Sequence, residues 1–112
     1  MSFRERTYKM DEITIDSAYY DDIQTIARLV IDRYKSVGSL RNPYAEAANM
    51  LKGVKHRNEQ AFSNDAKNEV HLNNSELWAL NAAIDDLSKE PHPDMSVKTL
   101  RLLSNYLSQF NK

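Results

Sequence analysis

Apolar residues recur at three- and four-residue steps in four separate stretches of the chain. This spacing places them along one side of an α-helix, because successive helical residues are rotated by about 100°. We therefore predict four amphipathic helices, and their short connections favour antiparallel neighbours. The predicted fold class is all-α, a small antiparallel helical bundle of about four helices.

The first predicted helix begins near Asp16 or Ser17, because both residue types are good N-caps. Gly38 is predicted to end it, since glycine readily adopts the left-handed conformation that follows many helices. The apolar face of this helix consists of Tyr20, Ile23, Ala27, Val30, Ile31 and Tyr34.

The second predicted helix has Asn42 as its N-cap and Pro43 at its first position, where the missing N–H group would have no intrahelical partner. Its apolar pattern continues to Phe62 and leaves open whether the helix runs further or breaks near residues 63–65. Gly53 lies inside this helix and weakens it by about 1 kcal/mol relative to alanine.

The third predicted helix has the most complete start signal in the chain. Asn73 and Glu76 have the spacing of a capping box, and Leu72 and Leu77 have the spacing of a hydrophobic staple around it. This helix is expected to run to about Ser88, before the Pro91-His92-Pro93 segment forces an extended turn.

The fourth predicted helix starts at Asp94 or Ser96 and runs to about Phe110. It carries two adjacent apolar stripes, so its apolar arc is wide. A wide arc indicates a helix that is central in the bundle or shared with another subunit. The main stripe is Leu100, Leu103, Leu107 and Phe110, and the second is Met95, Leu102 and Tyr106.

The predicted domain organisation is a polar, basic N-terminal arm over residues 1–15 and a single helical-bundle domain over residues 16–112. The sequence is 41% hydrophobic and 28% charged, which argues against intrinsic disorder. It contains only 2 glycines, far fewer than the turns of an all-β domain usually need.

Charge and cysteine content narrow the function classes. The formal net charge is −1, which disfavours a domain built mainly for nucleic acid. No cysteine is present, and the first twelve residues lack the apolar core of a signal peptide. The chain has no apolar run that would cross a bilayer. We expect a cytoplasmic protein that does not bind membranes.

Catalytic and metal-binding motifs are missing from the sequence. None of His56, His71 and His92 has another histidine four residues away, and no Glu-x-x-His or Glu-x-x-Glu set occurs. The acidic pairs, including Asp85-Asp86, are interpreted as solvated helix-capping residues. We expect no enzyme activity, no catalytic residue, no bound metal and no cofactor.

Some apolar residues lie outside the predicted stripes and indicate a second apolar surface. Trp78 lies about 140° from the centre of its helix's apolar face, and Leu29 lies nearly opposite the stripe of the first helix. Trp78 either packs under the N-terminal arm or is available to a partner. This surplus predicts a regulatory, non-catalytic module that binds a protein partner or self-associates. The candidate contact residues are Trp78, Leu29, Tyr106, Phe3 and Tyr8.

Nucleic-acid binding is the alternative interpretation. The second predicted helix has the densest group of basic residues, and the basic arm would add to it. Glu46 and Glu59 border this group, and a phosphate surface needs several uncompensated cations. The candidate contacts for this alternative are Arg41, Lys52, Lys55 and Arg57.

Overall fold

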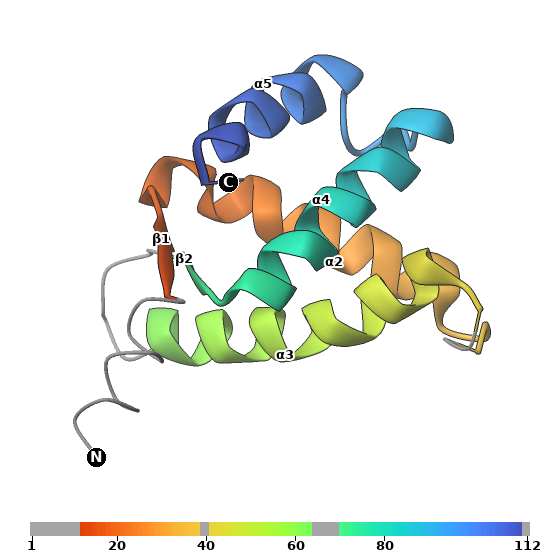
Figure 1. The fold of residues 1–112 in the computed structure, drawn as a ribbon, viewed down its shortest axis with the longest axis horizontal. Coiled ribbons are helices and arrows are strands. Elements are labelled where there is room, and N and C mark those ends of the chain that lie inside the picture. Colours follow the sequence, from red (N-terminus) through yellow and green to blue (C-terminus); the bar gives the residue numbers. More distant parts are fainter. Residues whose placement is uncertain (1–11, 39–40, 64–69, 111–112) are drawn as a thin grey trace.

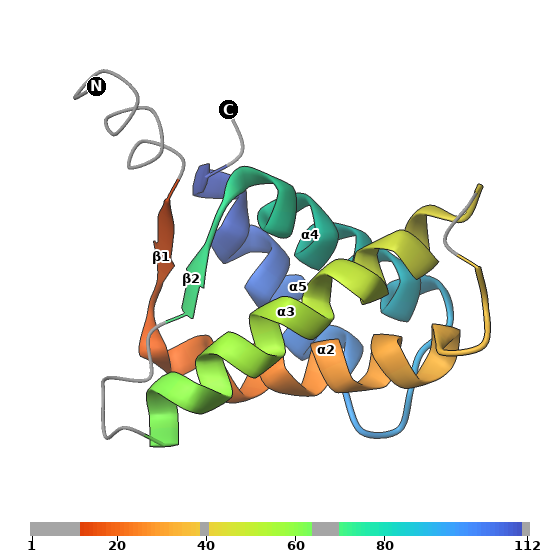
Figure 2. The same ribbon diagram turned by 90° about the horizontal axis from the view of Figure 1, so that it is seen from below.

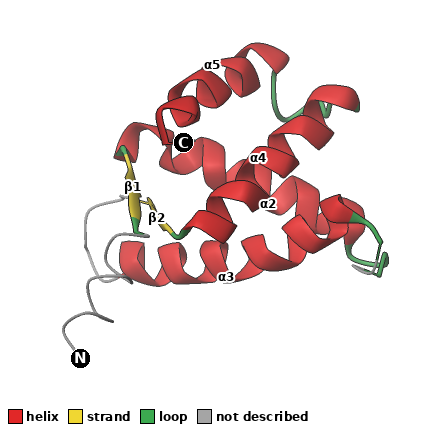
Figure 3. Ribbon diagram, in the orientation of Figure 1, coloured by secondary structure: helices red, strands yellow, loops and turns green. Residues whose placement is uncertain are grey.

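The computed structural model describes residues 12–38, 41–63 and 70–110, with side chains of residues 59–63 left aside. Its helices are α2 (Tyr20–Tyr34), α3 (Pro43–Ser63), α4 (Asn74–Lys89) and α5 (Val97–Leu107). Two short strands, β1 (Ile13–Ile15) and β2 (Val70–Leu72), and two 3-10 turns, η1 (Ser17–Tyr19) and η2 (Ser108–Phe110), complete the described chain (Figure 3). The predicted all-α class and small helical bundle are confirmed.

The helices surround one interior. α4 runs diagonally between α3 and α5, and α2 lies behind it (Figure 1). The view from below shows α3 crossing the molecule beside α2 and α4 (Figure 2). The largest fully buried side chains come from all four helices and both strands: Ile15, Ile23, Ile26, Val30, Leu51, Val54, Leu72, Leu80, Leu87, Leu100, Leu103 and Leu107.

Local hydrogen bonds fix the predicted starts of α3 and α4, whereas α2 begins at Tyr20, after the 3-10 turn η1 that Asp16 caps. Asn42 Oδ1 accepts hydrogen bonds from the backbone N–H groups of Tyr44 (3.0 Å) and Ala45 (3.2 Å) at the start of α3. The side chains of Asn73 and Glu76 exchange hydrogen bonds with each other's backbone N–H groups, at 2.8 and 2.9 Å. The predicted N-cap and capping box are therefore confirmed.

The end of the first predicted helix differs from the expectation. α2 ends at Tyr34, four residues before Gly38, and Gly38 does not adopt a positive φ. Among the described residues the left-handed conformation occurs instead at Arg41, with φ of 71°, directly before the N-cap Asn42. The chain reverses in that short connection, so the glycine is not needed as a helix cap.

The two strands join the N-terminal end of the described chain to the start of α4. They pair antiparallel, with Ile13 opposite Leu72 and Ile15 opposite Val70. Residues 13–15, which were counted in the predicted arm, therefore belong to the fold, while residues 1–11 lie outside the described part. No β2 strand was predicted, because three residues carry too little periodicity to identify one.

Two open questions from the sequence are settled by the helix bounds. α3 ends at Ser63, so the helix runs one residue beyond Phe62. α5 begins after the N-cap Ser96, whose hydroxyl accepts a hydrogen bond from the Thr99 backbone N–H at 3.1 Å. No helix in the described ranges has both the length and the apolar character that crossing a membrane requires.

Candidate functional site

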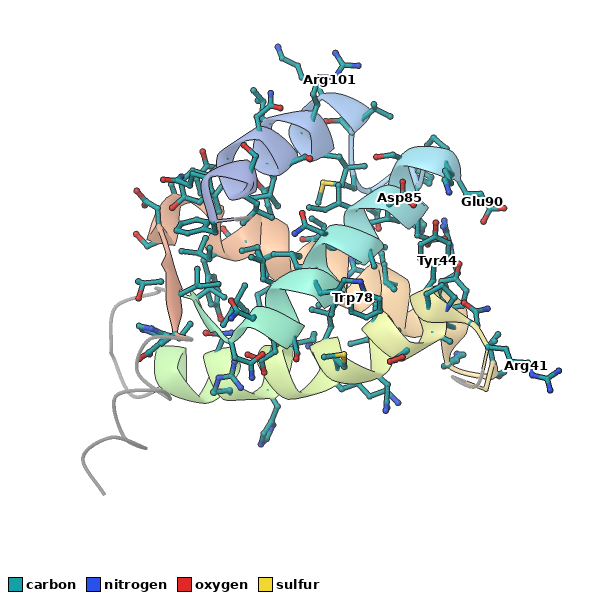
Figure 4. All side chains as sticks on the ribbon, viewed as in Figure 1. Arg41, Tyr44, Trp78, Asp85, Glu90 and Arg101 are labelled. Atoms are coloured by element: carbon teal, nitrogen blue, oxygen red, sulfur yellow. The ribbon has the colours of Figure 1, made fainter. Side chains whose placement is uncertain are left out.

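Trp78 is the most conspicuous apolar side chain on the surface. It lies in the second turn of α4, with 44% of its area exposed, and projects from the front of the molecule (Figure 4). Its neighbours in the sequence, Leu77 and Ala79, are buried and pack α4 against the core. The indole of Trp78 therefore lies on the outer side of the helix. The angular position derived from the sequence placed Trp78 off the apolar face of its helix but left open whether the N-terminal arm covers it, and residues 1–11 lie outside the described part of the chain.

A shallow groove runs beside Trp78 between α4 and α5. It has a volume of about 340 Å³. Ile84 and Leu100 are buried and form its apolar floor, and Val97 is a partly exposed wall. Asn81 lines the groove three residues after Trp78 on α4, so the tryptophan stands one helical turn from the groove.

The rim of the groove is polar, and most of its side chains are neutral. Asn81 and Ser88 line it from α4, and their donors bond to backbone carbonyls of their own helix at 3.1 and 2.8 Å. Arg101 and Asn105 line it from α5. Arg101 has no ion-pair partner among the described residues, so its charge is available to an incoming group.

We define the α4–α5 surface as Trp78, the groove and its rim. It combines an aromatic side chain, an apolar floor and hydrogen-bonding groups on two packed helices. That combination matches the anatomy of protein-binding patches, in which an apolar centre is surrounded by a polar rim. The surface therefore offers apolar packing and hydrogen-bonding groups to a molecule that would contact it.

Asp85 borders this surface and is held by two neighbours. The Tyr44 hydroxyl donates a hydrogen bond to Asp85 Oδ2 at 2.5 Å, and Lys89 Nζ lies 3.3 Å from the same oxygen. The hydrogen bond from Tyr44, followed by the interaction with Lys89, lowers the pKa of Asp85. Its carboxylate is thus fixed in its charged form between α3 and α4.

Asp86 is buried, which corrects the expectation of a solvated acidic pair. It is 3% exposed and accepts hydrogen bonds from Arg33 (2.8 Å) and the Tyr34 hydroxyl (2.5 Å). Arg33 also donates to the Glu90 carbonyl at 2.9 Å. Burial, and then the hydrogen bond to Asp86, raise the pKa of Tyr34 to about 12.

A signal for this buried acid was present in the sequence. Ala79, Ala83 and Asp86 follow the i, i+4, i+7 spacing, so Asp86 continues a row of small residues along α4. Both alanines are fully buried. The network of Arg33, Tyr34 and Asp86 therefore fastens the end of α2 to α4 and supports the α4–α5 surface from behind.

Leu29 is not available as a contact residue. It is 5% exposed, and Ile26 beside it is fully buried. α2 packs against α3 and α4, and Arg28 bonds to Asp94 in the α4–α5 connection at 3.5 Å. Because α2 is covered from several sides, its buried arc extends well beyond the single stripe that the periodicity showed.

Tyr106 is engaged within the molecule. Its ring stacks on Tyr19 with centroids 4.3 Å apart, and its hydroxyl accepts a hydrogen bond from the Asp16 backbone N–H at 3.1 Å. This places it at the junction of α5 with η1 and away from the groove residues. Phe3 and Tyr8, the remaining candidate contacts, lie outside the described residues.

The four basic candidates do not share one face. Arg57 forms two hydrogen bonds with the Glu76 carboxylate, at 2.9 and 3.1 Å, and donates to the His71 carbonyl at 2.7 Å. Lys52 precedes Arg57 by five positions on α3, which rotates it by roughly 140°. Arg41 lies beyond the opposite end of α3 (Figure 4). The predicted phosphate-binding group is therefore divided, and Arg57 is compensated.

Comparisons with protein-family models, curated proteins and solved structures give no significant match to this chain. Among the described residues, no three histidine, aspartate or glutamate side chains come together in a way that would hold a metal ion. The proposal below therefore depends on the geometry of the α4–α5 surface.

Proposed function

We propose that this chain is a non-catalytic module that binds a protein partner stoichiometrically through the α4–α5 surface. The observation that carries the proposal is the 44% exposure of Trp78 on α4, one helical turn from the first residue of a groove with an apolar floor. Roles of this kind include a small inhibitor, an immunity or antitoxin-like factor, or an accessory subunit. Self-association through the same surface is the homotypic form of the proposal.

Trp78 is suited to act as the anchor. Tryptophan is enriched among the residues that dominate binding energy, because it buries a large area with few rotamers. Its backbone belongs to a helix with a complete capping box, so little conformational entropy is lost when a partner covers it. Most of the free energy of binding is thus expected to come from this one side chain.

The mechanism is steric. A partner that covers Trp78 also fills the groove over Ile84 and Leu100. The side chains of Asn81 and Asn105 on the rim then form hydrogen bonds to the partner's polar groups in place of water. The partner's own working surface is then covered by two rigid helices. Only binding and release are needed, and no bond is made or broken.

The test compares the full chain with Trp78→Ala and a matched control, Val37→Ala. Val37 is 44% exposed, the same fraction as Trp78, and lies in the turn after α2, where it lines no part of the α4–α5 groove. The three proteins are immobilised at equal density and exposed to extract from the native host. We expect a partner retained by the full chain and by Val37→Ala, and lost with Trp78→Ala.

The stability of the variants separates an anchor from a core residue. Because Trp78 is nearly half exposed, its removal should lower the free energy of unfolding by roughly 2 kcal/mol, below the ~3–5 kcal/mol of a buried Trp deletion. Urea unfolding measures this difference. A Trp78→Ala protein that is folded and retains the same partner as the full chain would overturn the proposal.

A further inference from the structure

The described chain begins beside the start of α4, the helix that carries the exposed Trp78. Ile13 of β1 lies opposite Leu72, and Leu72 directly precedes Asn73, the N-cap of α4. Because the two strands are antiparallel, the chain before Ile13 leaves the fold toward the N-terminal end of α4. In Figure 2 this end of β1 lies beside the first turn of α4.

The side chain of His71 holds this exit point. Its Nδ1 atom lies 3.2 Å from Glu12 Oε2 and 3.4 Å from Thr14 Oγ1. His71 belongs to β2, which leads directly into α4. The position from which residues 1–11 leave the fold is therefore tied to the start of α4.

Trp78 is within reach of residues that leave from this point. It follows Asn73 by five positions, which is about 7.5 Å along a helix axis. Tyr8 lies five positions before Ile13, and an extended chain of that length spans about 16 Å. Ser75 precedes Trp78 by three positions and is exposed, so the same face of α4 connects the helix start to the indole.

The N-terminal segment, which we define as residues 1–11, carries side chains that suit an indole. Aromatic rings and thioethers pack on an indole, and cations lie over its face. The apolar side chains of the segment are Phe3, Tyr8 and Met10, and its basic ones are Arg4, Arg6 and Lys9. Its composition therefore matches the one large aromatic side chain exposed beside its exit point.

We propose that the N-terminal segment lies across Trp78 and competes with the protein partner for it. Tyr8 and Met10 are the apolar side chains nearest to the exit point, and they supply the contact. The contact itself needs no partner, but the competition rests on the proposed function, because Trp78 must be the anchor. A partner then binds only the fraction of molecules in which Trp78 is uncovered, which lowers its apparent affinity.

Attachment favours this segment over a second copy of the chain as the group that covers Trp78. A tethered group has an effective concentration on the order of millimolar, and it loses little further freedom when it binds. A second copy loses its translational and rotational freedom and binds only at sufficient protein concentration. The two occupants therefore differ in whether the cover depends on concentration.

The first experiment measures how exposed the indole is. Trp78 is the only tryptophan, so quenching of tryptophan fluorescence by acrylamide reports on this side chain alone. The full chain is compared with Phe3→Ala/Tyr8→Ala/Met10→Ala and with the matched control Ser2→Ala/Thr7→Ala. We expect the triple variant to raise the quenching constant about twofold, as a mostly covered side chain becomes mostly open. The control should leave it unchanged.

The second experiment locates the segment directly. The chain has no cysteine, so Ser2→Cys carries a nitroxide label at one known position. We expect this label to broaden the NMR signal of the Trp78 indole. The methyl signals of Val37, which lies beside the first half of α3, should stay sharp.

Three results would overturn the inference. They are equal quenching in all three folded proteins, quenching that changes with protein concentration, and a label that leaves the indole signal sharp. Concentration dependence would assign the cover to a second copy. Circular dichroism checks that every variant is folded.

The competition is tested separately from the contact. With a partner that the immobilised full chain retains, we expect the triple variant to bind about two- to tenfold more tightly, and equal affinity would refute the competition. A chain that shows the contact but retains no partner would refute the proposed function instead. The two failures are therefore distinguishable.

Discussion

Gly53 lies inside α3 without a packing reason to be a glycine. A Cβ atom built at this position meets no atom within 4 Å, and the backbone is helical. Glycine in a helix interior loses more backbone entropy than alanine on folding and gives less shelter to the backbone. The position is therefore a weak point of the helix that a single methyl group can repair.

We predict that Gly53→Ala raises the free energy of unfolding by roughly 0.5–1 kcal/mol. Chemical denaturation followed by circular dichroism measures the change. An unchanged or lower stability would mean that the glycine serves α3 in a way that the open space around it does not reveal.

At the scale of single residues, periodicity identified the buried stripes better than the residues outside them: Ile23, Val30 and Leu103 are fully buried as predicted. The outward position of Trp78 followed from one helical angle, because only its own helix determines it. The same reasoning gave a wrong prediction for Leu29, because α2 packs against several neighbouring elements and a helical angle does not show which elements surround a helix. Arg57 was assigned to a basic patch, and its pairing with Glu76 depends on a neighbour nineteen positions away.

At the scale of elements, the Asp86 network determines how α2 and α4 are joined. Its side chain is nearly inaccessible to water and accepts hydrogen bonds from Arg33 and Tyr34 together. A buried ion pair gains little over an apolar contact, but removing one partner leaves the other charge without compensation. Arg33 would keep Glu90, whose carboxylate lies 3.7 Å away, whereas the Tyr34 hydroxyl would lose its hydrogen-bond acceptor.

We predict that Asp86→Ala lowers the free energy of unfolding by roughly 2–3 kcal/mol, because the hydrogen bonds from Arg33 and Tyr34 are lost. The adjacent Asp85→Ala is the matched control. Its carboxylate is half exposed, so its pairs with Tyr44 and Lys89 should contribute at most ~1 kcal/mol. Urea unfolding of both variants compares them directly, and equal losses would show that burial at position 86 is not what stabilises this junction.

Helix starts could be predicted from sequence, and helix ends less well. The caps at Asn42, Asn73 and Ser96 depend on the cap and the next few residues, so a short sequence window contains the whole signal. The end of α2 depends on how the chain turns toward α3, which involves Arg41 rather than the glycine. The short strands depend on each other across more than fifty residues, beyond any local pattern.

At the scale of the whole molecule, the network of Arg33, Tyr34 and Asp86 makes the free energy of unfolding decrease at alkaline pH. The pKa of Tyr34 is raised to about 12 in the folded state, so the folded protein keeps this proton while the unfolded chain releases it near pH 10. The stabilising contribution is complete below pH ~10 and is lost as the pH rises toward 12.

We predict that thermal midpoints fall between about pH 10 and pH 12, and that Tyr34→Phe makes this fall shallower. Tyr106→Phe is the matched control, because it removes another partly buried tyrosine hydroxyl while leaving Asp86 untouched. A slope that is the same in both variants and the full chain would show that Tyr34 does not carry the dependence.

The overall architecture was predictable because each helix carries its own apolar stripe and start signal. The α4–α5 surface was predictable only in part. Trp78 was identified, whereas the groove requires the packing of two helices and cannot be seen in either alone. The candidate site is thus a property of the assembled molecule more than of a motif.

The β1–β2 pairing also bears on the order in which the chain acquires its structure. Ile13 meets Leu72 across 59 positions, whereas α3, α4 and α5 each pack on a neighbour in the sequence. Closing so long a loop has an entropic cost that is offset only once the intervening helices are compact. We therefore expect the strand pair to form late in folding, after the helices have become compact and before Ile15 and Val70 are fully enclosed.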